Sequence, residues 1–291
     1  MPSLSPSSLF KGRPVLLAAL ALALVLPRAA HAGESLPERT LAGIVDREKR
    51  ILADAAKSGE AIDAESFRVQ VQGLCNEYEI LLRENPNFAA GYASYGYLLS
   101  KMEMPRQAIA ILLKANQLDP NIPLVKNQIG NFLAEQGKPI EAENYYLAAI
   151  ALDPGEPLYH YQLGQLLYLA RDEFLKSGYW TADQIDDTMH KAFARAAELA
   201  PNRIEFTYRY AESFNDLRRP DWDKALKVWA SLEDKETSDV GRQVIRLQAA
   251  NVLIKEGKFD AARVLIATVS EPKLAPQKQK LVAQLPENAK H

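Results

Sequence analysis

The sequence predicts an all-α fold made of stacked pairs of antiparallel helices, and three columns of residues that recur every 34 positions lead to this prediction. The columns hold a glycine, a leucine and a proline, each found three times: Gly96, Gly130 and Gly164; Leu99, Leu133 and Leu167; and Pro86, Pro120 and Pro154. A fixed period of this length is typical of a helical repeat, in which one unit cannot bury its apolar face alone and neighbouring units bury it together.

Small residues mark the place where the two helices of a unit are expected to cross. Gly96 and Ala108 lie there, because only small side chains let two helix backbones approach to about 8–10 Å. Large residues such as Leu112 and Tyr146 are expected to fill the layer around the crossing.

Prolines mark the helix ends. Pro105 and Pro139 follow short turns and fit the first helical position, where a missing N–H costs least. Each unit then closes on Leu-Asp-Pro, at 118–120 and 152–154, because the residue before a proline is disfavoured in the helical region.

These columns resemble the tetratricopeptide repeat, TPR. Units 89–122 and 123–156 fit its pattern without a gap, whereas units at about 157–203, 204–237 and 243–270 fit it less closely, the first of them carrying 13 extra residues. The resemblance implies a right-handed α-solenoid, the TPR superhelix. It also implies that the first helix of each unit lines a concave groove that accepts an extended peptide or a partner's helix.

The predicted organisation has no second domain. It comprises a signal peptide (1–32), an N-terminal helical cap or degenerate repeat (33–86), a TPR array of about five units (87–270) with an insertion near 171–186, and a C-terminal tail or capping helix (271–291). Helices are expected at about 37–57 and 65–84 in the cap, and a short one around 277–283 in the tail.

The first 32 residues are typical of a secretory signal. Lys11 and Arg13 precede the apolar run from Val15 to Leu26, and Ala30-His31-Ala32 follows as a small-residue cleavage site. The run is shorter than the ~20 residues that a spanning helix needs, although a retained membrane anchor stays open as the alternative. We expect an exported protein, in a bacterial periplasm or alternatively secreted, with no membrane span after cleavage.

Composition argues against nucleic acid as a partner. The signal holds three of the 35 basic residues and no acid, so 32 remain against 37 acidic residues, and no uninterrupted basic run occurs in the repeats. No glycine-rich phosphate loop, Cys-x-x-Cys, Gly-x-Ser-x-Gly or His-Glu-x-x-His pattern occurs. We therefore expect neither an enzyme nor a cofactor nor a small-molecule substrate.

One alternative gives the chain a metal-dependent or enzymatic accessory role. Asp183, Asp187 and His190 are spaced to lie along one helix face, with Asp186 beside them. The competing interpretation is that Thr181-x-x-Gln184 is a capping box and that these acids favour the helix dipole. We favour the second, because a fourth ligand is not visible.

The predicted groove is lined by tyrosines and amides. Its residues are Tyr97, Asn127, Asn131, Tyr161, Gln165, Tyr168, Tyr208, Asn215 and Asn251, and Leu247 also falls on this face. Amides can pair with a peptide backbone in either polarity, and tyrosines supply rigid contact area with a polar tip. The alternative, a plain solvated helix face, stays open.

A carboxylate-binding groove of the kind found in chaperone-binding TPR proteins is not expected. The matching positions carry no positive charge: Ala93, Tyr97, Gln128, Leu158 and Gln162.

The insertion is expected to protrude as a hairpin by extending both helices, with Tyr179 and Trp180 at its bend. The two residues either form an exposed contact site, or Trp180 packs back onto the extended helices as local core.

The lone Cys75 is expected to be a small buried hydrophobe.

Overall fold

The computed structural model describes residues 35–58 and 63–286, and within them it contains fourteen α-helices and no strand. The all-α prediction is confirmed. The signal-peptide prediction falls on residues 1–34, which lie outside the described residues.

The chain divides into two compact units, Met1–Pro120 and Asn121–His291. The boundary falls between the two regular repeats, although one continuous array was expected. Contacts in a stack of repeats are made only between neighbours, so such a chain can divide between any two of them.

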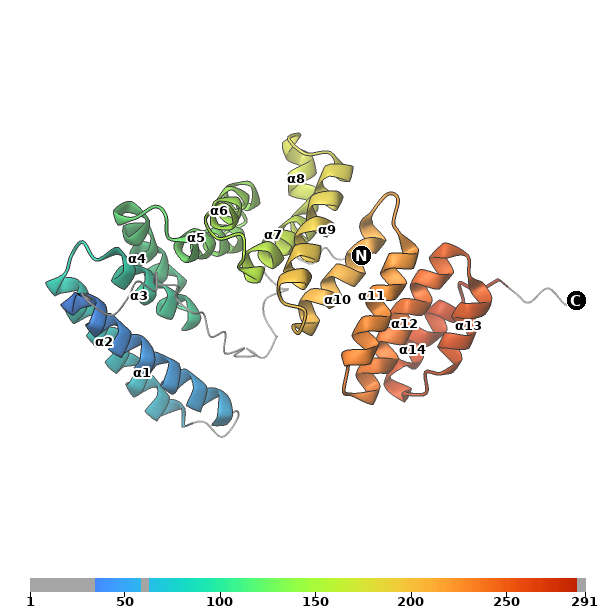
Figure 1. Cartoon of the computed structure of the whole chain (residues 1–291), viewed down its shortest axis with the longest axis horizontal. Helices are drawn as coiled ribbons and strands as arrows, with labels where there is room; N and C mark the ends of the chain where they lie inside the picture. Colours follow the sequence, from blue (N-terminus) through green and yellow to red (C-terminus); the bar gives the residue numbers. More distant parts are fainter. Residues whose placement is uncertain (1–34, 59–62, 287–291) are drawn as a thin grey trace, which may run out of the picture. The chain divides into compact units, whose positions relative to one another are not determined.

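The described residues of the first unit form four helices, which pair α1 with α2 and α3 with α4 (Figure 1): α1 (Leu36–Ser58), α2 (Ala64–Glu84), α3 (Ala89–Lys101) and α4 (Pro105–Leu118). Its centre is polar as well as apolar, because the buried Tyr78 donates a hydrogen bond to Glu48 Oε2 at 2.9 Å. Lys101 Nζ lies 3.4 Å from the other carboxylate oxygen of Glu48. Cys75 is buried nearby, as predicted, and burial raises the pKa of its thiol.

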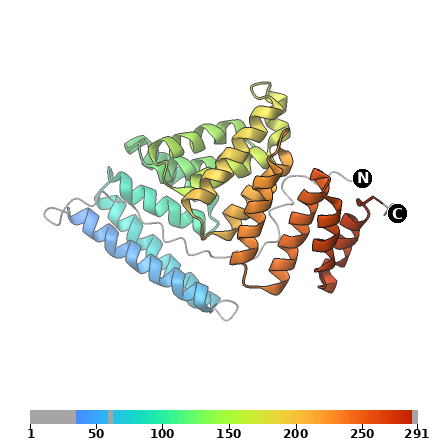
Figure 2. The ribbon, with the colours of Figure 1, turned by 45° about the vertical axis from the view of Figure 1, so that its right-hand side comes forward.

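The second unit contains the other ten helices: α5 (Pro123–Glu135), α6 (Pro139–Leu152), α7 (Pro157–Leu169), α8 (Arg171–Ser177), α9 (Ala182–Leu199), α10 (Ile204–Ser213), α11 (Trp222–Lys235), α12 (Asp239–Glu256), α13 (Phe259–Ala267) and α14 (Ala275–Val282). The pairs are α5 with α6, α7 with α9, α10 with α11, and α12 with α13. Successive helices α11, α12 and α13 lie side by side in both views (Figures 1 and 2).

The repeated glycines lie where the helices cross, as predicted. A Cβ atom on Gly96 would come within 2.7 Å of Leu112, and one on Gly130 would come within 2.7 Å of Tyr146. A Cβ atom on Gly164 would lie 2.7 Å from Phe193 in the same way. The large side chain of the second helix thus occupies the space that each glycine leaves.

The helix ends follow the prolines. Helices α4 and α6 begin at Pro105 and Pro139. The preceding turns place Glu103 (φ 55°) and Gly137 (φ 71°) in the left-handed region at positions 34 residues apart. Only glycine adopts this conformation without steric cost, so the earlier turn is the less favourable of the two.

The insertion differs from its prediction in one respect. Helix α7 ends at Leu169 and a separate short helix, α8, continues the chain, so the first helix is broken at Ala170 rather than extended. The second helix is extended as expected: α9 begins at Ala182 behind a capping box formed by Thr181 and Gln184.

Two clusters of buried side chains lie within the second unit. The central cluster runs from Ala142 on α6 to Val252 on α12, and a separate C-terminal cluster joins α12 to α13 and α14 through residues such as Ile266 and Leu281. Helix α12 contributes to both, with Ile245 and Val252 in the central cluster and Leu247, Ala250 and Ile254 in the C-terminal one.

Candidate interaction surface

The first helices of the pairs in the second unit, α5, α7, α10 and α12, carry polar side chains that bond to one another. We call the surface formed by Asn131, Gln162, Gln165, Tyr168, Tyr208, Arg209, Glu212, Asn215 and Gln248 the first-helix face. All of these residues are partly buried except Tyr168, which is 44% exposed.

Hydrogen bonds connect α5 to α7. Asn131 Oδ1 accepts from Gln162 Nε2 at 3.0 Å and from the hydroxyl of Tyr146 at 2.7 Å. The Asn131 amide is therefore fixed in orientation, with its Nδ2 directed away from these two donors.

The connection continues from α7 to α10. Gln165 Nε2 donates to the Tyr161 hydroxyl at 2.9 Å, and Gln165 Oε1 accepts from Arg209 Nη2 at 3.2 Å. The ring of Tyr161 packs against Phe193 and Phe206, with centroid distances of 5.8 and 4.5 Å. Tyr161 is therefore as much a packing residue as a surface one.

Two further bonds connect α10 and its C-terminal extension to α12. The Tyr208 hydroxyl accepts from Gln248 Nε2 at 3.0 Å, while the Tyr208 ring packs edge-on against Trp229. Asn215 Oδ1 accepts from Lys255 Nζ at 2.7 Å. Asn251, also predicted for this surface, is half-buried.

Two predicted positions are wrong because the side chains are fully buried. Asn127 has no exposed surface, and neither polar atom of its amide has a hydrogen-bond partner among the described residues. Leu247 is likewise buried, and the neighbouring Gln248 faces the surface instead. In the first unit, Tyr97 is half-buried, and the Lys101 ammonium lies 4.2 Å from its ring centroid.

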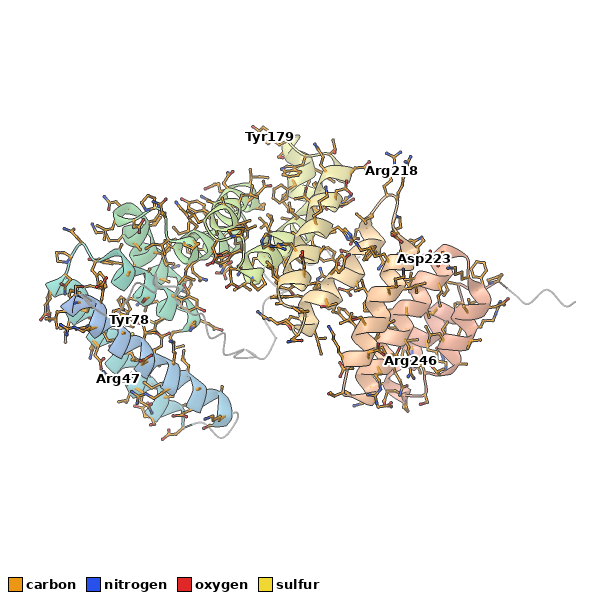
Figure 3. All side chains as sticks on the ribbon, in the orientation of Figure 1. Arg47, Tyr78, Tyr179, Arg218, Asp223 and Arg246 are labelled. Carbon is orange, nitrogen blue, oxygen red and sulfur yellow. The ribbon has the colours of Figure 1, made fainter. Side chains whose placement is uncertain are left out.

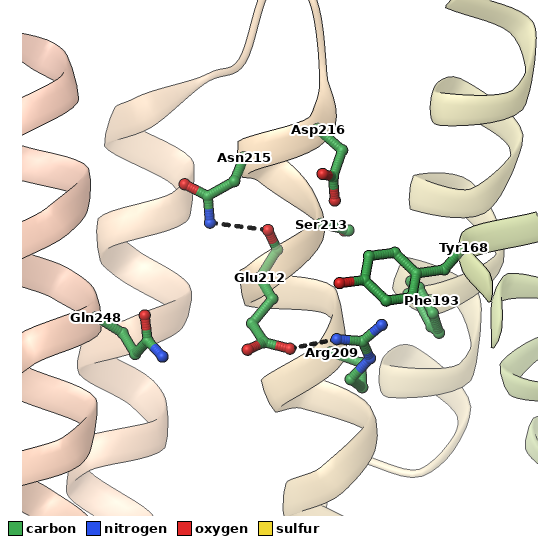
Figure 4. Close-up of a pocket in the computed structure, with 8 residues that line it drawn as sticks. All are labelled: Tyr168, Phe193, Arg209, Glu212, Ser213, Asn215, Asp216 and Gln248. Carbon is green, nitrogen blue, oxygen red and sulfur yellow. Dashed lines mark hydrogen bonds and ion pairs between the residues drawn. The ribbon is translucent and has the colours of Figure 1, made fainter. Parts of the chain in front are cut away.

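A pocket of about 150 Å³ opens on the first-helix face (Figure 4). Its lining comes from α7, α9, α10, the turn after α10, and α12: Tyr168, Phe193, Arg209, Glu212, Ser213, Asn215, Asp216 and Gln248. The Arg209 guanidinium lies 4.3 Å from the Tyr168 ring centroid and 5.3 Å from that of Phe193, and it also pairs with Glu212.

Of the pocket residues, the sequence predicted only Tyr168 and Asn215 as site residues. Arg209, Asp216 and Gln248 were missed, and Glu212 was considered only as an outward position. The i, i+3 spacing of Arg209 and Glu212 is the sequence signal that could have indicated a fixed ion pair on this helix face.

Of the two residues at the tip of the insertion, Tyr179 is exposed, whereas Trp180 packs as local core. Tyr179 is 82% exposed and points outward from the end of the α8–α9 hairpin (Figure 3). Trp180 instead packs edge-on against the buried Phe174, with ring centroids 6.4 Å apart. Burial raises the pKa of Glu143 on α6, and a hydrogen bond from Trp180 opposes this shift without cancelling it.

The proposed metal-binding face gains no support. Asp183 pairs with Arg218 at 3.1 Å, and Asp186 pairs with Arg171. His190 Nδ1 lies 2.8 Å from the Ser213 hydroxyl, and burial lowers the pKa of His190 to about 4. Over residues 35–58 and 63–286, no three His, Cys, Asp or Glu side chains are grouped so that they could hold a metal ion.

None of the helices in the described part of the chain is both long and apolar enough to cross a membrane.

Comparisons with known proteins agree with the fold. The family model of the tetratricopeptide repeat matches residues 89–122 and 125–156. No curated protein matches the chain in a sequence search.

Solved structures of similar fold include YrrB, described as a TPR protein with an unusual peptide-binding site. It is 18% identical, the match covers 72% of this chain and 93% of YrrB, and the TM-score is 0.55. PilF of Pseudomonas aeruginosa is 16% identical over 83% of this chain and 99% of its own, with a TM-score of 0.54. At these identities the similarity shows the fold alone.

Proposed function

We propose that this chain, which carries tetratricopeptide repeats, is a non-catalytic scaffold or adaptor of the cell envelope that binds an extended polypeptide along its first-helix face. Proteins built from these repeats generally mediate protein–protein interactions. The peptide-binding site that YrrB is described as having supports the proposal only by analogy of fold.

The observation that carries the proposal is the set of polar atoms left unpaired on the first-helix face. Asn131 Nδ2 is a donor with no hydrogen-bond partner among the described residues. Gln248 Oε1 is an open acceptor. A peptide main chain carries both an N–H donor and a C=O acceptor at each residue, so it can satisfy both kinds of atom.

Rigidity also favours peptide binding. The amides that would contact a partner are held by hydrogen bonds to neighbouring helices, as between Gln165 and Arg209 or Gln248 and Tyr208. A surface that is already ordered loses little side-chain entropy on binding. Tyr168 adds an exposed aromatic ring near the middle of the same face.

Photo-crosslinking in native cells tests the proposal. A photoreactive amino acid at Tyr168 is expected to capture a specific polypeptide partner, and Asn131→Ala in the same chain is expected to reduce the yield. The matched control is the same amino acid at Leu147 on α6, which is equally exposed at 44% and lies outside the pocket. Equal crosslinks from both positions would show that the first-helix face is not the binding surface.

The envelope location has its own test. Lys11, Arg13 and the apolar run from 15 to 26 support export. Mass spectrometry of the protein from its host is expected to find a mature N-terminus at Gly33. A full-length chain in the membrane fraction would indicate a retained anchor, and a full-length chain in the cytoplasm would contradict export.

A further inference from the structure

Hydrogen bonds within the chain use some of the donors in the pocket on the first-helix face. Arg209 donates from Nη1 to Glu212 and from Nη2 to Gln165, while its buried Nε has no hydrogen-bond partner among the described residues. Asn215 Nδ2 donates to the main-chain carbonyl of Glu212 at 2.9 Å, and Gln248 Nε2 donates to Tyr208.

Several acceptors of the pocket are also left without a partner. Glu212 uses one carboxylate oxygen for Arg209 and keeps Oε1 open. Asp216 has no hydrogen bond or ion pair with any described residue, and Gln248 Oε1 is also open. These open acceptors can receive hydrogen bonds from a group that only donates.

Charge favours the same kind of ligand. Arg209, Glu212 and Asp216 are the charged residues of the lining, so the lining itself carries a net charge of −1. Asp216 is an exposed residue, but partial burial of its carboxyl raises its pKa, and the nearby Asp186 raises it further, whereas Arg209, Lys255 and Arg171 act in the opposite direction without cancelling the shift. A cation placed against Asp216 would relieve this cost.

The aromatic wall of the pocket adds a shape requirement. The Arg209 guanidinium lies 4.3 Å from the centroid of the Tyr168 ring, yet Tyr168 remains 44% exposed. Figure 4 shows the Tyr168 hydroxyl between the carboxylate of Asp216 and the guanidinium of Arg209 in that view. A flat cation can therefore stack on the open part of the ring while it donates to the carboxylates.

We propose that this pocket binds the guanidinium group of an arginine side chain in the polypeptide partner, held by Glu212 and Asp216 and stacked on Tyr168. The inference rests on the proposed function, because the arginine would belong to the peptide on the first-helix face. Arginine fits better than lysine, since it presents five donors in a planar fork that can reach two carboxylates and stack at once.

Lys255 limits the strength of this site but does not fill it. Its ammonium donates to Asn215 Oδ1 at 2.7 Å and makes no ion pair with Asp216. It still places a positive charge close to the pocket, which repels a second cation. Removing this charge is therefore expected to strengthen arginine binding.

Binding of short capped peptides to the full chain tests the proposal. The probes are acetyl-Gly-Gly-Xaa-Gly-Gly-amide with arginine, lysine or citrulline as Xaa, and dissociation constants come from NMR titration. Citrulline has nearly the shape of arginine without its charge. The arginine peptide is expected to bind about tenfold more tightly than the citrulline peptide, as for one charge-assisted hydrogen bond in a partly buried site.

Variants identify the residue responsible. Asp216→Asn keeps the shape of the side chain and is expected to abolish the preference for arginine over citrulline. Asp172→Asn on α8, an exposed acid outside the pocket, is expected to preserve it. Lys255→Gln is expected to tighten arginine binding about threefold, as for one partly screened charge.

Equal binding of the arginine and citrulline peptides, no binding of any peptide at millimolar concentration, or an unchanged preference in Asp216→Asn would each overturn the inference. If crosslinks from Tyr168 persist in that case, the proposed groove stands without arginine selectivity. If they are absent as well, both proposals fail.

Discussion

The guanidinium of Arg171 donates two hydrogen bonds to the carboxylate of Asp186, from Nε to Oδ1 at 2.7 Å and from Nη2 to Oδ2 at 2.8 Å. The pair joins the first residue of α8 to the first turns of α9 and so closes the base of the insertion hairpin. The Asp186 side chain is 9% exposed and that of Arg171 38% exposed, so the burial is one-sided.

Breaking this pair is expected to cost more from one side than from the other. Arg171→Met leaves a buried carboxylate without its partner and should lower the free energy of unfolding by about 2 kcal/mol. Asp186→Asn leaves an arginine that can turn to solvent, and about 1 kcal/mol is expected. Denaturant unfolding of both variants measures this. The control, Arg195→Met, removes an exposed i, i+3 pair with Glu198 on the same helix and should cost less than about 0.5 kcal/mol. Equal losses of unfolding free energy in all three variants would contradict the one-sided burial of the Arg171–Asp186 pair.

The close helix crossing at Gly130 is expected to reject even a methyl group. A Cβ there would lie 2.7 Å from the ring of Tyr146, which is 4% exposed and bonded to Asn131, so the ring cannot move freely. Gly130→Ala should therefore lower the free energy of unfolding by about 1–3 kcal/mol. Gly73→Ala in α2, where a Cβ meets nothing within 4 Å, should instead raise it by about 0.5–1 kcal/mol. A stabilised Gly130→Ala protein would show that the crossing is looser than described.

His190 is expected to make stability depend on pH in the acidic range. Its pKa is about 4 in the folded protein because burial disfavours the charged form; Lys224 and Lys191 act in the same direction and Asp187 opposes them. The unfolded chain takes up the proton near the ordinary value of about 6.5. The unfolded state therefore binds more protons between these values, and stability falls by up to about 3 kcal/mol as pH drops from 6.5 to 4.

Denaturant unfolding at several pH values measures the slope of the free energy of unfolding against pH. His190→Gln can still bond to Ser213 but carries no charge, so the slope between pH 4 and 6.5 should become shallower. His160→Gln removes another imidazole and serves as the matched control variant. A slope that survives in His190→Gln would place the titrating group elsewhere.

The two equivalent turns before α4 and α6 are expected to respond oppositely to substitution. Glu103 has φ 55° and Gly137 φ 71°. Glu103→Gly removes a steric cost and should raise the free energy of unfolding by about 0.5 kcal/mol, whereas Gly137→Ala introduces one and should lower it by about 1 kcal/mol. Thermal unfolding of the two variants is sufficient, and changes of the same sign would contradict the shared turn geometry.

The regular part of the chain could be predicted from the sequence because its spacing fixes which residues face inward. Gly130 and Tyr146 were assigned to a crossing from one column of small residues and one of large residues, and they meet there. Pro139 fixed a helix start for the same reason, since only one helical position tolerates proline well.

The irregular parts were less predictable because no column fixes their phase. In the last helix pair Leu247 is buried and Gln248 faces out, an error of one residue that shifts a helical side chain by about 100°. Asn127 was assigned correctly to a first helix, but its burial depends on neighbours that a repeat pattern does not specify. The pocket brings together Tyr168, Asp216 and Gln248 from separate helices and a turn, and such a meeting has no signature along the chain.

Helix α12 belongs to two cores at once, because Val252 faces the central cluster while Ala250 and Ile254 face the C-terminal one. The two cores share no buried side chain, so loss of the second does not expose the interior of the first. Opening of α13 and α14 would then be a partial unfolding event confined to the end of the chain, with α12 as its boundary. Gln248 and Lys255 lie on this boundary helix, so fraying at the C-terminus would reach the edge of the proposed binding surface before it reached Arg209.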